Sequence, residues 1–219
     1  MKPLTVDLQD EESLRDLGSA SVQVVHDLKN QLNGLKLYAT FLRKRLEKGD
    51  RPADELETVG KLIAGLERAA TDMNLLVRLG RPLDLRRQPR TELSRILSAA
   101  GEGQKVEAEA GTYEGEFDSA ALTEALRGVG EGARAMLGQA RQAGALAVHL
   151  RREETGGAPA AVIEWRGAAR REEGGADAFK SFAGPAGLRL ALAARVIRAH
   201  GGEVAHEADI LRARLPLST

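Results

Sequence analysis

Apolar residues in the first third of the chain recur with alternating steps of three and four, which is the spacing of a coiled-coil seam. No proline interrupts Glu11–Lys48, so this seam predicts one long helix. Gly49 and Pro52 then end it, because glycine terminates helices and proline cannot continue them. Two long helices joined by so short a turn form an antiparallel hairpin. The first seam comprises Val25, Leu28, Leu32, Leu35, Ala39, Leu42 and Leu46, and the second comprises Leu56, Val59, Ile63, Leu66, Ala70, Met73 and Val77.

Each helix of this hairpin carries more apolar residues than one partner helix can cover. The additional ones are Leu37, Tyr38 and Phe41 beside the first seam and Leu62, Leu75 and Leu76 beside the second. Pairing two hairpins into a four-helix bundle would bury these side chains. The pattern therefore predicts a homodimer.

The pattern changes after Gly80, and we expect two domains, 1–80 and 81–219. Arg81–Leu85 reads as an extended linker, and Thr91 as the N-cap of a short helix. Helices are predicted at Asp118–Leu137 and Gly187–His200, and strands at Lys105–Ala110, Tyr113–Phe117, Ala145–Arg152, Ala160–Arg166, Glu203–Glu207 and Ile210–Leu217. Helices grouped with a mixed or antiparallel sheet make the second domain an α/β sandwich, and the fold class of the whole chain α+β.

Composition and charge exclude several kinds of function. The 219 residues contain 32 Lys and Arg against 32 Asp and Glu, and no cysteine. Without a basic excess, a nucleic-acid partner is not expected, and without cysteine there is no thiol catalysis, disulfide framework or zinc ribbon. The first 18 residues are acidic and contain no apolar run, so we expect neither a signal peptide nor a membrane anchor, and a cytoplasmic location.

The candidate chemistry lies on the first helix. His26 falls one step off the seam, so its imidazole is expected on the outer face of the bundle. Asn30 lies about one turn further along the same face, and Asp27 follows the histidine directly. An exposed imidazole is a nucleophile for phosphoryl groups, and it needs a partner that accepts or orients its proton.

Val25–Leu35 resembles the phosphoacceptor box of sensor histidine kinases, in which a histidine on the dimerisation hairpin is followed by an acidic residue and, at the fourth position, by Asn or Thr. His26, Asp27 and Asn30 match these positions. Kinases often have proline directly after the Asn. Gln31 replaces it here, which leaves the helix less bent without removing the chemistry.

The resemblance continues through the second half of the chain. Arg81–Leu93 followed by Asp118–Met136 is similar to the entry of the kinase ATP-binding domain, and Phe179–Glu203 is similar to its last helix. His200, before Gly201, is expected to be an ordinary residue at a helix end.

Three positions depart from the residues that hold ATP in that family. Glu131 stands where the family has an Asn that helps to hold magnesium. Trp165–Ala169 lacks the Asp and the second Gly of the loop that reads adenine. Pro185–Leu190 has lost two of the three glycines of a phosphate-approaching turn and carries the bulky Arg189. We therefore expect a domain that keeps the kinase fold and does not bind ATP.

A phosphorylatable histidine beside a degenerate nucleotide domain resembles a histidine phosphotransferase of bacterial phosphorelays. This resemblance implies catalytic roles for His26 (phosphoacceptor), Asp27 and Asn30, and response-regulator receiver domains as partners. It implies no cofactor or metal site in this chain, with Mg²⁺ supplied by the receiver. Three alternatives remain at this point: an active cytosolic kinase with a divergent ATP site, a non-catalytic scaffold that binds a receiver or a kinase, and a receiver phosphatase in which Asn30 or Gln31 orients water.

Overall fold

The computed structural model describes residues 8–47, 53–101, 106–139, 146–155, 158–168, 177–180, 182 and 184–218. Within these ranges the side chains of residues 8–24, 26, 27, 53, 54, 138, 139 and 155 lie outside the description. The chain divides into two compact units, Met1–Pro82 and Leu83–Thr219.

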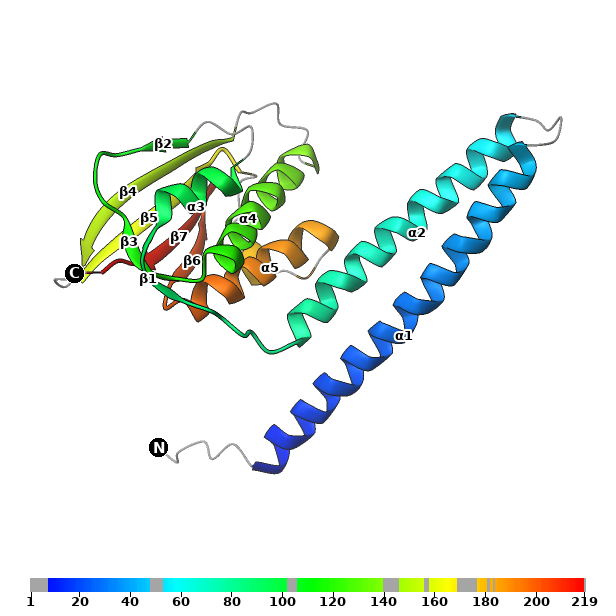
Figure 1. The fold of residues 1–219 in the computed structure, drawn as a ribbon, viewed down its shortest axis with the longest axis horizontal. Helices are drawn as coiled ribbons and strands as arrows, with labels where there is room; N and C mark the ends of the chain where they lie inside the picture. Colours follow the sequence, from blue (N-terminus) through cyan, green and yellow to red (C-terminus); the bar gives the residue numbers. More distant parts are fainter. Residues whose placement is uncertain are drawn as a thin grey trace. The chain divides into compact units, whose positions relative to one another are not determined.

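The first unit is a hairpin of two long antiparallel helices, α1 (Leu8–Glu47) and α2 (Ala53–Gly80), which lie side by side in Figure 1. This confirms the helices predicted from the two seams. Ala39, Val59 and Ile63 are buried between the helices, and Leu46 and Leu66 pack against them. An ion pair between Lys36 Nζ and Glu67 Oε1 (2.7 Å) fixes the register of the two helices.

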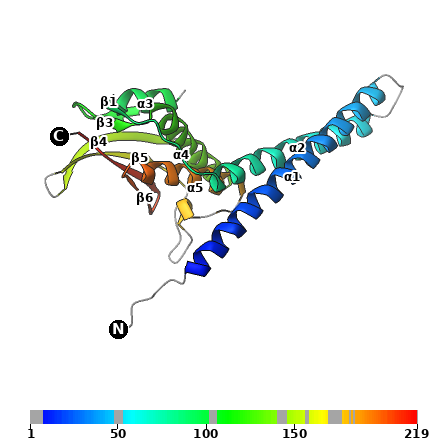
Figure 2. The same cartoon turned by 60° about the horizontal axis from the view of Figure 1, so that its bottom comes forward.

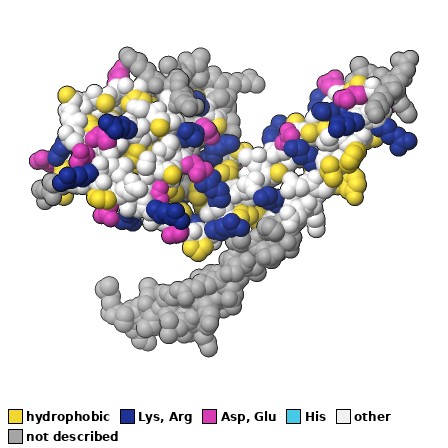
Figure 3. Space-filling view, in the orientation of Figure 1, with side chains coloured by type: hydrophobic (Ala, Val, Ile, Leu, Met, Phe, Trp, Pro, Cys, Tyr) yellow, Lys and Arg dark blue, Asp and Glu magenta, His cyan; other side chains and the backbone are white. Residues whose placement is uncertain are grey.

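Much of the apolar surface of this hairpin remains uncovered. Among the side chains of the hairpin that the structure describes, eight large apolar ones are 40–72% exposed: Leu28, Leu35, Leu37, Tyr38, Phe41, Leu42, Leu62 and Leu76. Leu28, Leu35 and Leu42 recur every seven residues, so they form one row along α1. Figure 3 shows hydrophobic side chains gathered on the hairpin. So wide an apolar surface on a small helical unit marks an interaction site.

The second unit is a two-layer α/β sandwich (Figures 1 and 2). Its five-stranded sheet has the order β2-β4-β5-β7-β6, with β2 parallel to β4 and the other neighbours antiparallel, which confirms the predicted mixed sheet. A second sheet pairs β1 with β3. The strands are β1 (Gln88–Glu92), β2 (Val106–Ala108), β3 (Glu114–Phe117), β4 (Ala147–Thr155), β5 (Ala158–Arg166), β6 (Glu203–Glu207) and β7 (Ile210–Pro216), and the helices are α3 (Leu93–Ala100), α4 (Ser119–Gln139), the 3₁₀ turn η1 (Ala178–Lys180) and α5 (Gly184–Ala199).

The core of this unit lies between one face of the large sheet and the helices. Strand β5 contributes Ala161, Ile163 and Trp165, which alternate along the strand and therefore point to the same face. Helices α4 and α5 pack closely because Gly132 has no side chain. A Cβ there would lie 2.7 Å from Cγ of Leu190, well inside van der Waals contact.

Strand β1 was not predicted, and the prediction of Thr91 as an N-cap is wrong. Thr91 pairs with Gly115 of β3, so its backbone belongs to the sheet. The cap of α3 is Glu92, whose longer side chain accepts hydrogen bonds from the backbone N–H (3.5 Å) and hydroxyl (2.9 Å) of Ser94. Pairing across the sheet thus moved the helix start by one residue. Of the predicted strand ends, Lys105 and Ala145 lie outside the described residues.

Asp118 is the N-cap of α4. It also forms hydrogen bonds to residues before the helix and at the end of α5. Its carboxylate accepts hydrogen bonds from the backbone N–H groups of Ala121 (2.9 Å) and Arg86 (2.7 Å). Its own N–H donates to Nε2 of His200 (3.0 Å), at the end of α5. Since Nε2 accepts, the proton of this imidazole lies on Nδ1, 2.8 Å from the carbonyl oxygen of Val196. His200 is therefore a neutral structural residue, as predicted.

The stability of the second unit is expected to fall below pH 6.5 because of His200. Burial lowers the pKa of this imidazole below its usual 6.5. The hydrogen bond to Val196 and the charge of Asp118 raise the pKa, but their effect is smaller than that of burial. The charge of Arg87 lowers the pKa further. As the pH falls below 6.5, the imidazole takes up a proton in the unfolded chain but stays neutral to a lower pH in the folded chain. The stability that this group contributes above pH 6.5 is therefore lost below it, by up to about 1.4 kcal/mol per pH unit.

Urea unfolding between about pH 7 and pH 5 measures this loss, in a range above the titration of carboxylates. The variant His200→Gln should flatten the profile. A wild-type profile that is flat over this range would contradict the assignment.

Candidate functional site

The segment Val25–Leu35 lies within α1, about one to four turns before the buried contact at Ala39. The side chains of His26 and Asp27 lie outside the described residues, so their predicted exposure stays a prediction. The side chain of Asn30 is exposed. The backbone thus presents the three predicted catalytic residues on one regular helix, with Asn30 one turn after His26.

Glu131 and Arg189 are brought together by the packing of α4 against α5. Arg189 Nε lies 3.3 Å from Glu131 Oε2, and both side chains are partly exposed. These are two of the three positions at which the sequence departs from the kinase pattern, and 58 residues separate them. The structure therefore pairs the carboxylate at one of these positions with the guanidinium at the other.

The third position follows β5. Trp165 is 1% exposed and belongs to the core. The next residues turn back with Gly167 at φ +86°, a conformation that favours glycine. The backbone N–H groups of Gly167 (3.1 Å) and Ala168 (2.8 Å) donate to the carbonyl oxygen of Asp209, in the turn between β6 and β7. Ala169 lies outside the described residues.

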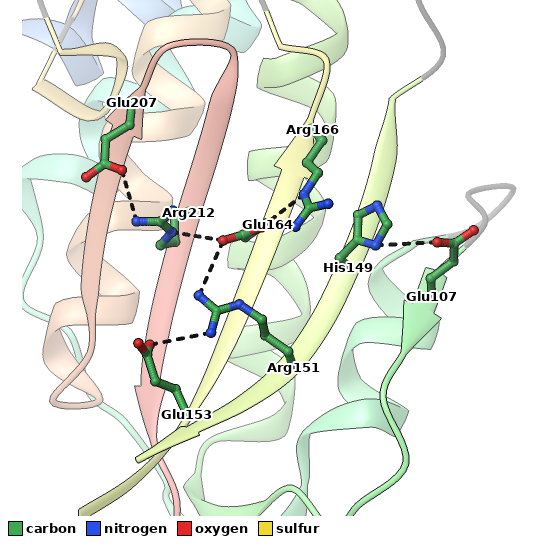
Figure 4. A network of polar contacts seen from close by, with 8 residues as sticks. All are labelled: Glu107, His149, Arg151, Glu153, Glu164, Arg166, Glu207 and Arg212. Carbon is green, nitrogen blue, oxygen red and sulfur yellow. Dashed lines mark hydrogen bonds and ion pairs between the residues drawn. The ribbon is translucent and has the colours of Figure 1, made fainter. Parts of the chain in front are cut away.

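A polar network that the sequence analysis missed covers the face of the large sheet opposite the helices (Figure 4). At its centre Glu164 is only 3% exposed. Its Oε2 accepts hydrogen bonds from Nε (3.0 Å) and Nη2 (2.7 Å) of Arg166, and its Oε1 accepts one from Nε of Arg212 (3.1 Å). Nη2 of Arg151 lies 3.5 Å from the same Oε1. Three strands, β4, β5 and β7, thus converge on one carboxylate.

The charge of this carboxylate is stabilised by its arginines. Burial raises the pKa of Glu164, but hydrogen bonds from Arg166 and Arg212 outweigh that effect and leave the pKa below its usual 4.5. Glu164 is therefore ionised near neutral pH, and its lone pairs are engaged. A carboxylate so engaged is a structural anchor rather than a general base.

Outer acidic residues extend the network across the sheet. Glu207 Oε2 accepts a hydrogen bond from Arg212 Nη1 (3.0 Å), and Glu153 lies 3.8 Å from Arg151. On the neighbouring strands His149 Nδ1 lies 3.4 Å from Glu107 Oε2. The alternation of residues along β5 could have indicated from the sequence that Glu164 lies on the face of the sheet opposite Ile163 and Trp165. The three arginines around it could not be found in this way, because two of them come from neighbouring strands whose order the sequence does not show.

Two kinds of feature are absent from the described part of the chain. No group of three His, Cys, Asp or Glu side chains there gathers closely enough to hold a metal ion. No helix among the described residues is both long and apolar enough to cross a membrane.

Comparisons with known proteins give a result at the level of the fold. No family model matches the chain, and no curated protein matches it. The crystal structure of full-length ShkA in complex with AMPPNP matches with a TM-score of 0.58 and 19% identity, covering 90% of this chain. This chain spans only 45% of that structure.

The Acinetobacter baumannii histidine kinase AdeS matches over 88% of this chain and 97% of its own, with a TM-score of 0.51 and 13% identity. Identities this low establish the fold alone. The protein therefore has the core fold of the sensor histidine kinases, a helical hairpin followed by an α/β sandwich domain.

Proposed function

We propose that this protein is a histidine phosphotransferase, which relays a phosphoryl group between response-regulator receiver domains through phospho-His26 and does not bind ATP. The observation that carries the proposal is the Glu131–Arg189 ion pair, in a chain that keeps a histidine, an acid and a carboxamide in the order of a phosphoacceptor box. The kinase-like fold supports a role in two-component signalling.

The residues at the nucleotide positions do not fit a magnesium-bound triphosphate. Glu131 places a negative charge where phosphate oxygens would approach, and Arg189 engages it at 3.3 Å. Binding a magnesium-bound nucleotide there would require breaking this pair, because Arg189 engages the carboxylate that would otherwise be available to Mg²⁺.

The proposed reaction needs only the hairpin and a receiver. A nitrogen of the neutral His26 imidazole attacks the phosphorus of a receiver's aspartyl phosphate. The P–N bond forms as the P–O bond to the aspartate breaks, and the aspartate leaves as a carboxylate. The ring becomes positively charged, and Asp27 stabilises or accepts the proton on its other nitrogen, while Asn30 orients the ring. The receiver supplies Mg²⁺, and the reverse of this step phosphorylates the next receiver.

The exposed apolar surface of the hairpin supports a homodimer as the working form. The row Leu28, Leu35 and Leu42 on α1, with Leu62 and Leu76 on α2, would become the interior of a four-helix bundle. Burying such side chains contributes roughly 1.5–3 kcal/mol each, enough for a stable interface.

A double variant Leu35→Glu, Leu42→Glu is expected to be monomeric at concentrations where the wild type is dimeric, because it would bury four carboxylates in the bundle. Sedimentation equilibrium measures the effect. The variant Lys44→Glu, at an exposed position of the same helix, serves as the control and should remain dimeric. A wild type that sediments as a monomer at about 10⁻⁵ M would contradict the dimer.

The experiment that tests the proposed function compares two phosphoryl donors. The purified chain is mixed with radiolabelled ATP, and separately with a radiolabelled phospho-receiver. Label is expected from the receiver and not from ATP. Labelling from ATP alone would identify a kinase, and release of inorganic phosphate from the receiver without a phosphohistidine would identify a phosphatase. No label from any cognate receiver would favour a scaffold.

A further inference from the structure

The linker that follows the hairpin is held on the second unit at three points. Leu83 packs against the core of that unit. The backbone N–H of Arg86 donates to Oδ2 of Asp118, the N-cap of α4, over 2.7 Å. The guanidinium of Arg87 donates to the carbonyl oxygen of Ala199, at the end of α5. The linker is therefore fixed to the start of one helix and to the end of the other.

His200 joins the same two helix ends. Its Nε2 accepts a hydrogen bond from the backbone N–H of Asp118 (3.0 Å), and its Nδ1 donates to the carbonyl oxygen of Val196 (2.8 Å). A backbone N–H can only donate and a carbonyl oxygen can only accept, so the two bonds fit one tautomer of the neutral imidazole. Protonation adds a hydrogen to Nε2, which then points at the N–H of Asp118. Two donors that face each other form no hydrogen bond, so the bond between α4 and α5 is lost at this point.

Protonation also weakens both hydrogen bonds of the linker. Among the described side chains, the charged ones that act on this imidazole are Asp118, which favours the protonated ring, and Arg87, which disfavours it. Phe117, on β3, contributes an uncharged ring whose centroid lies 6.1 Å from that of the imidazole. His200 is only 3% exposed, so water solvates an imidazolium there only after the groups around it move apart. The imidazolium then repels the guanidinium of Arg87, and Asp118 has lost the backbone bond that positions its carboxylate for Arg86.

We propose that His200 operates an acid-sensitive clamp on the linker: protonation of its Nε2 breaks the bond to Asp118 and releases the segment Leu83–Gln88 from α4 and α5 without unfolding the second unit. The clamp does not depend on the proposed role of His26. Asp118 stays ionised when the imidazole titrates, because the hydrogen bond from the N–H of Ala121 holds the pKa of its carboxyl below the usual 3.8. The imidazole is therefore the group of the clamp that changes charge in weak acid.

Amide hydrogen exchange of the full chain, followed residue by residue with NMR, tests the clamp. The protection factors of the Arg86 and Asp118 amides, corrected for the intrinsic effect of pH, are expected to fall about tenfold between about pH 7.5 and about pH 5.5, because a released imidazole titrates near 6.5. Low urea should leave both amides unaffected, since a local opening exposes little surface. The amide of Gly101, which donates to the carbonyl oxygen of Leu97 (2.9 Å) at the end of α3, is the internal control and should keep its protection.

The variant His200→Gln should remove the pH dependence of both amides, because its carboxamide oxygen can accept the N–H of Asp118 and does not titrate. An equal pH dependence in this variant would overturn the proposal. So would a wild-type Arg86 amide whose protection is constant with pH, or one that exchanges only through the urea-sensitive unfolding reported by the amides of the central strand β5. If the variant does not fold, the ¹⁵N shifts of the wild-type imidazole decide: a proton on Nε2 at neutral pH contradicts the clamp, and a proton on Nδ1 alone supports it.

Discussion

The variant His26→Gln is expected to take no label from a phosphorylated receiver, a loss of at least about a thousandfold relative to the wild type. Glutamine keeps the helix and a similar side-chain length but lacks the nucleophilic nitrogen, so no P–N bond can form. Phosphate-affinity gels or a radiolabel retained through alkaline denaturation measure the phosphohistidine. The effect is this large because the imidazole takes part in bond formation and nothing else in the site replaces it.

The control for this experiment is His149→Gln, which removes a histidine that contacts Glu107 on the sheet of the second unit. This variant should be labelled like the wild type. If the His26→Gln chain still accepts label, the phosphoacceptor is a different residue. The same conclusion follows if the label on the wild type survives acid, because phosphohistidine is hydrolysed in acid. The same variant also separates transfer from sequestration, because a scaffold would keep its biological effect without His26.

The variant Glu164→Gln is expected to destabilise the second unit by about 3 kcal/mol. Removing one partner of a buried ion pair costs roughly 3–5 kcal/mol, and the lower end applies here because the guanidiniums of Arg151, Arg166 and Arg212 are 31–48% exposed. Without the carboxylate these cations of three neighbouring strands repel each other across the sheet. Urea unfolding at neutral pH measures the loss.

Glu207→Gln provides the matched control, since Glu207 accepts a hydrogen bond from the same Arg212 but is 64% exposed. Its removal should cost no more than about 1 kcal/mol, as expected for surface pairs. Equal stabilities of the two variants would show that the Glu164 network is a solvated surface. Because the network lies on the face of the sheet opposite the helices, the hairpin chemistry should survive in any Glu164→Gln chain that is folded.

Together, the network and the Glu131–Arg189 pair suggest why the second unit can persist without a nucleotide. In the proposed phosphotransferase this domain has no ligand to hold α4 and α5 together. Gly132 lets Leu190 approach α4, and the ion pair between the neighbouring residues Glu131 and Arg189 links the same two helices. Ion pairing within the chain thus occupies groups that would otherwise attract phosphate or metal.

The parts of this protein that were predictable from the sequence are those governed by local rules. The seams at Leu32–Leu46 and Leu56–Val77 specify helices because an amphipathic stripe follows directly from 3.6 residues per turn. Gly49 and Pro52 predict the turn by equally local rules, and both lie outside the described residues. The cap at Asp118 and the helix stop at Gly201 depend on side chains within a few residues, and the structure confirms both.

The sequence-based predictions failed at positions where segments distant along the chain meet. Thr91 has good capping chemistry, yet pairing with β3 drew it into a strand and left Glu92 as the cap. Leu28, Leu35 and Leu42 belong to the same seam as Ala39, yet only Ala39 is buried in a single hairpin. The heptad pattern marks which residues are apolar, and it does not say which of them face α2 and which face a further partner.

By itself the sequence determined the helical hairpin, the order of strands and helices in the second unit, and the candidate site at His26, Asp27 and Asn30, because periodicity and motif spacing act over a few residues. Only the tertiary structure decided that Arg151, Arg166 and Arg212 share Glu164 and that Glu131 meets Arg189. These contacts join residues that are distant along the chain, and only strand order and helix register bring their charges within reach of each other.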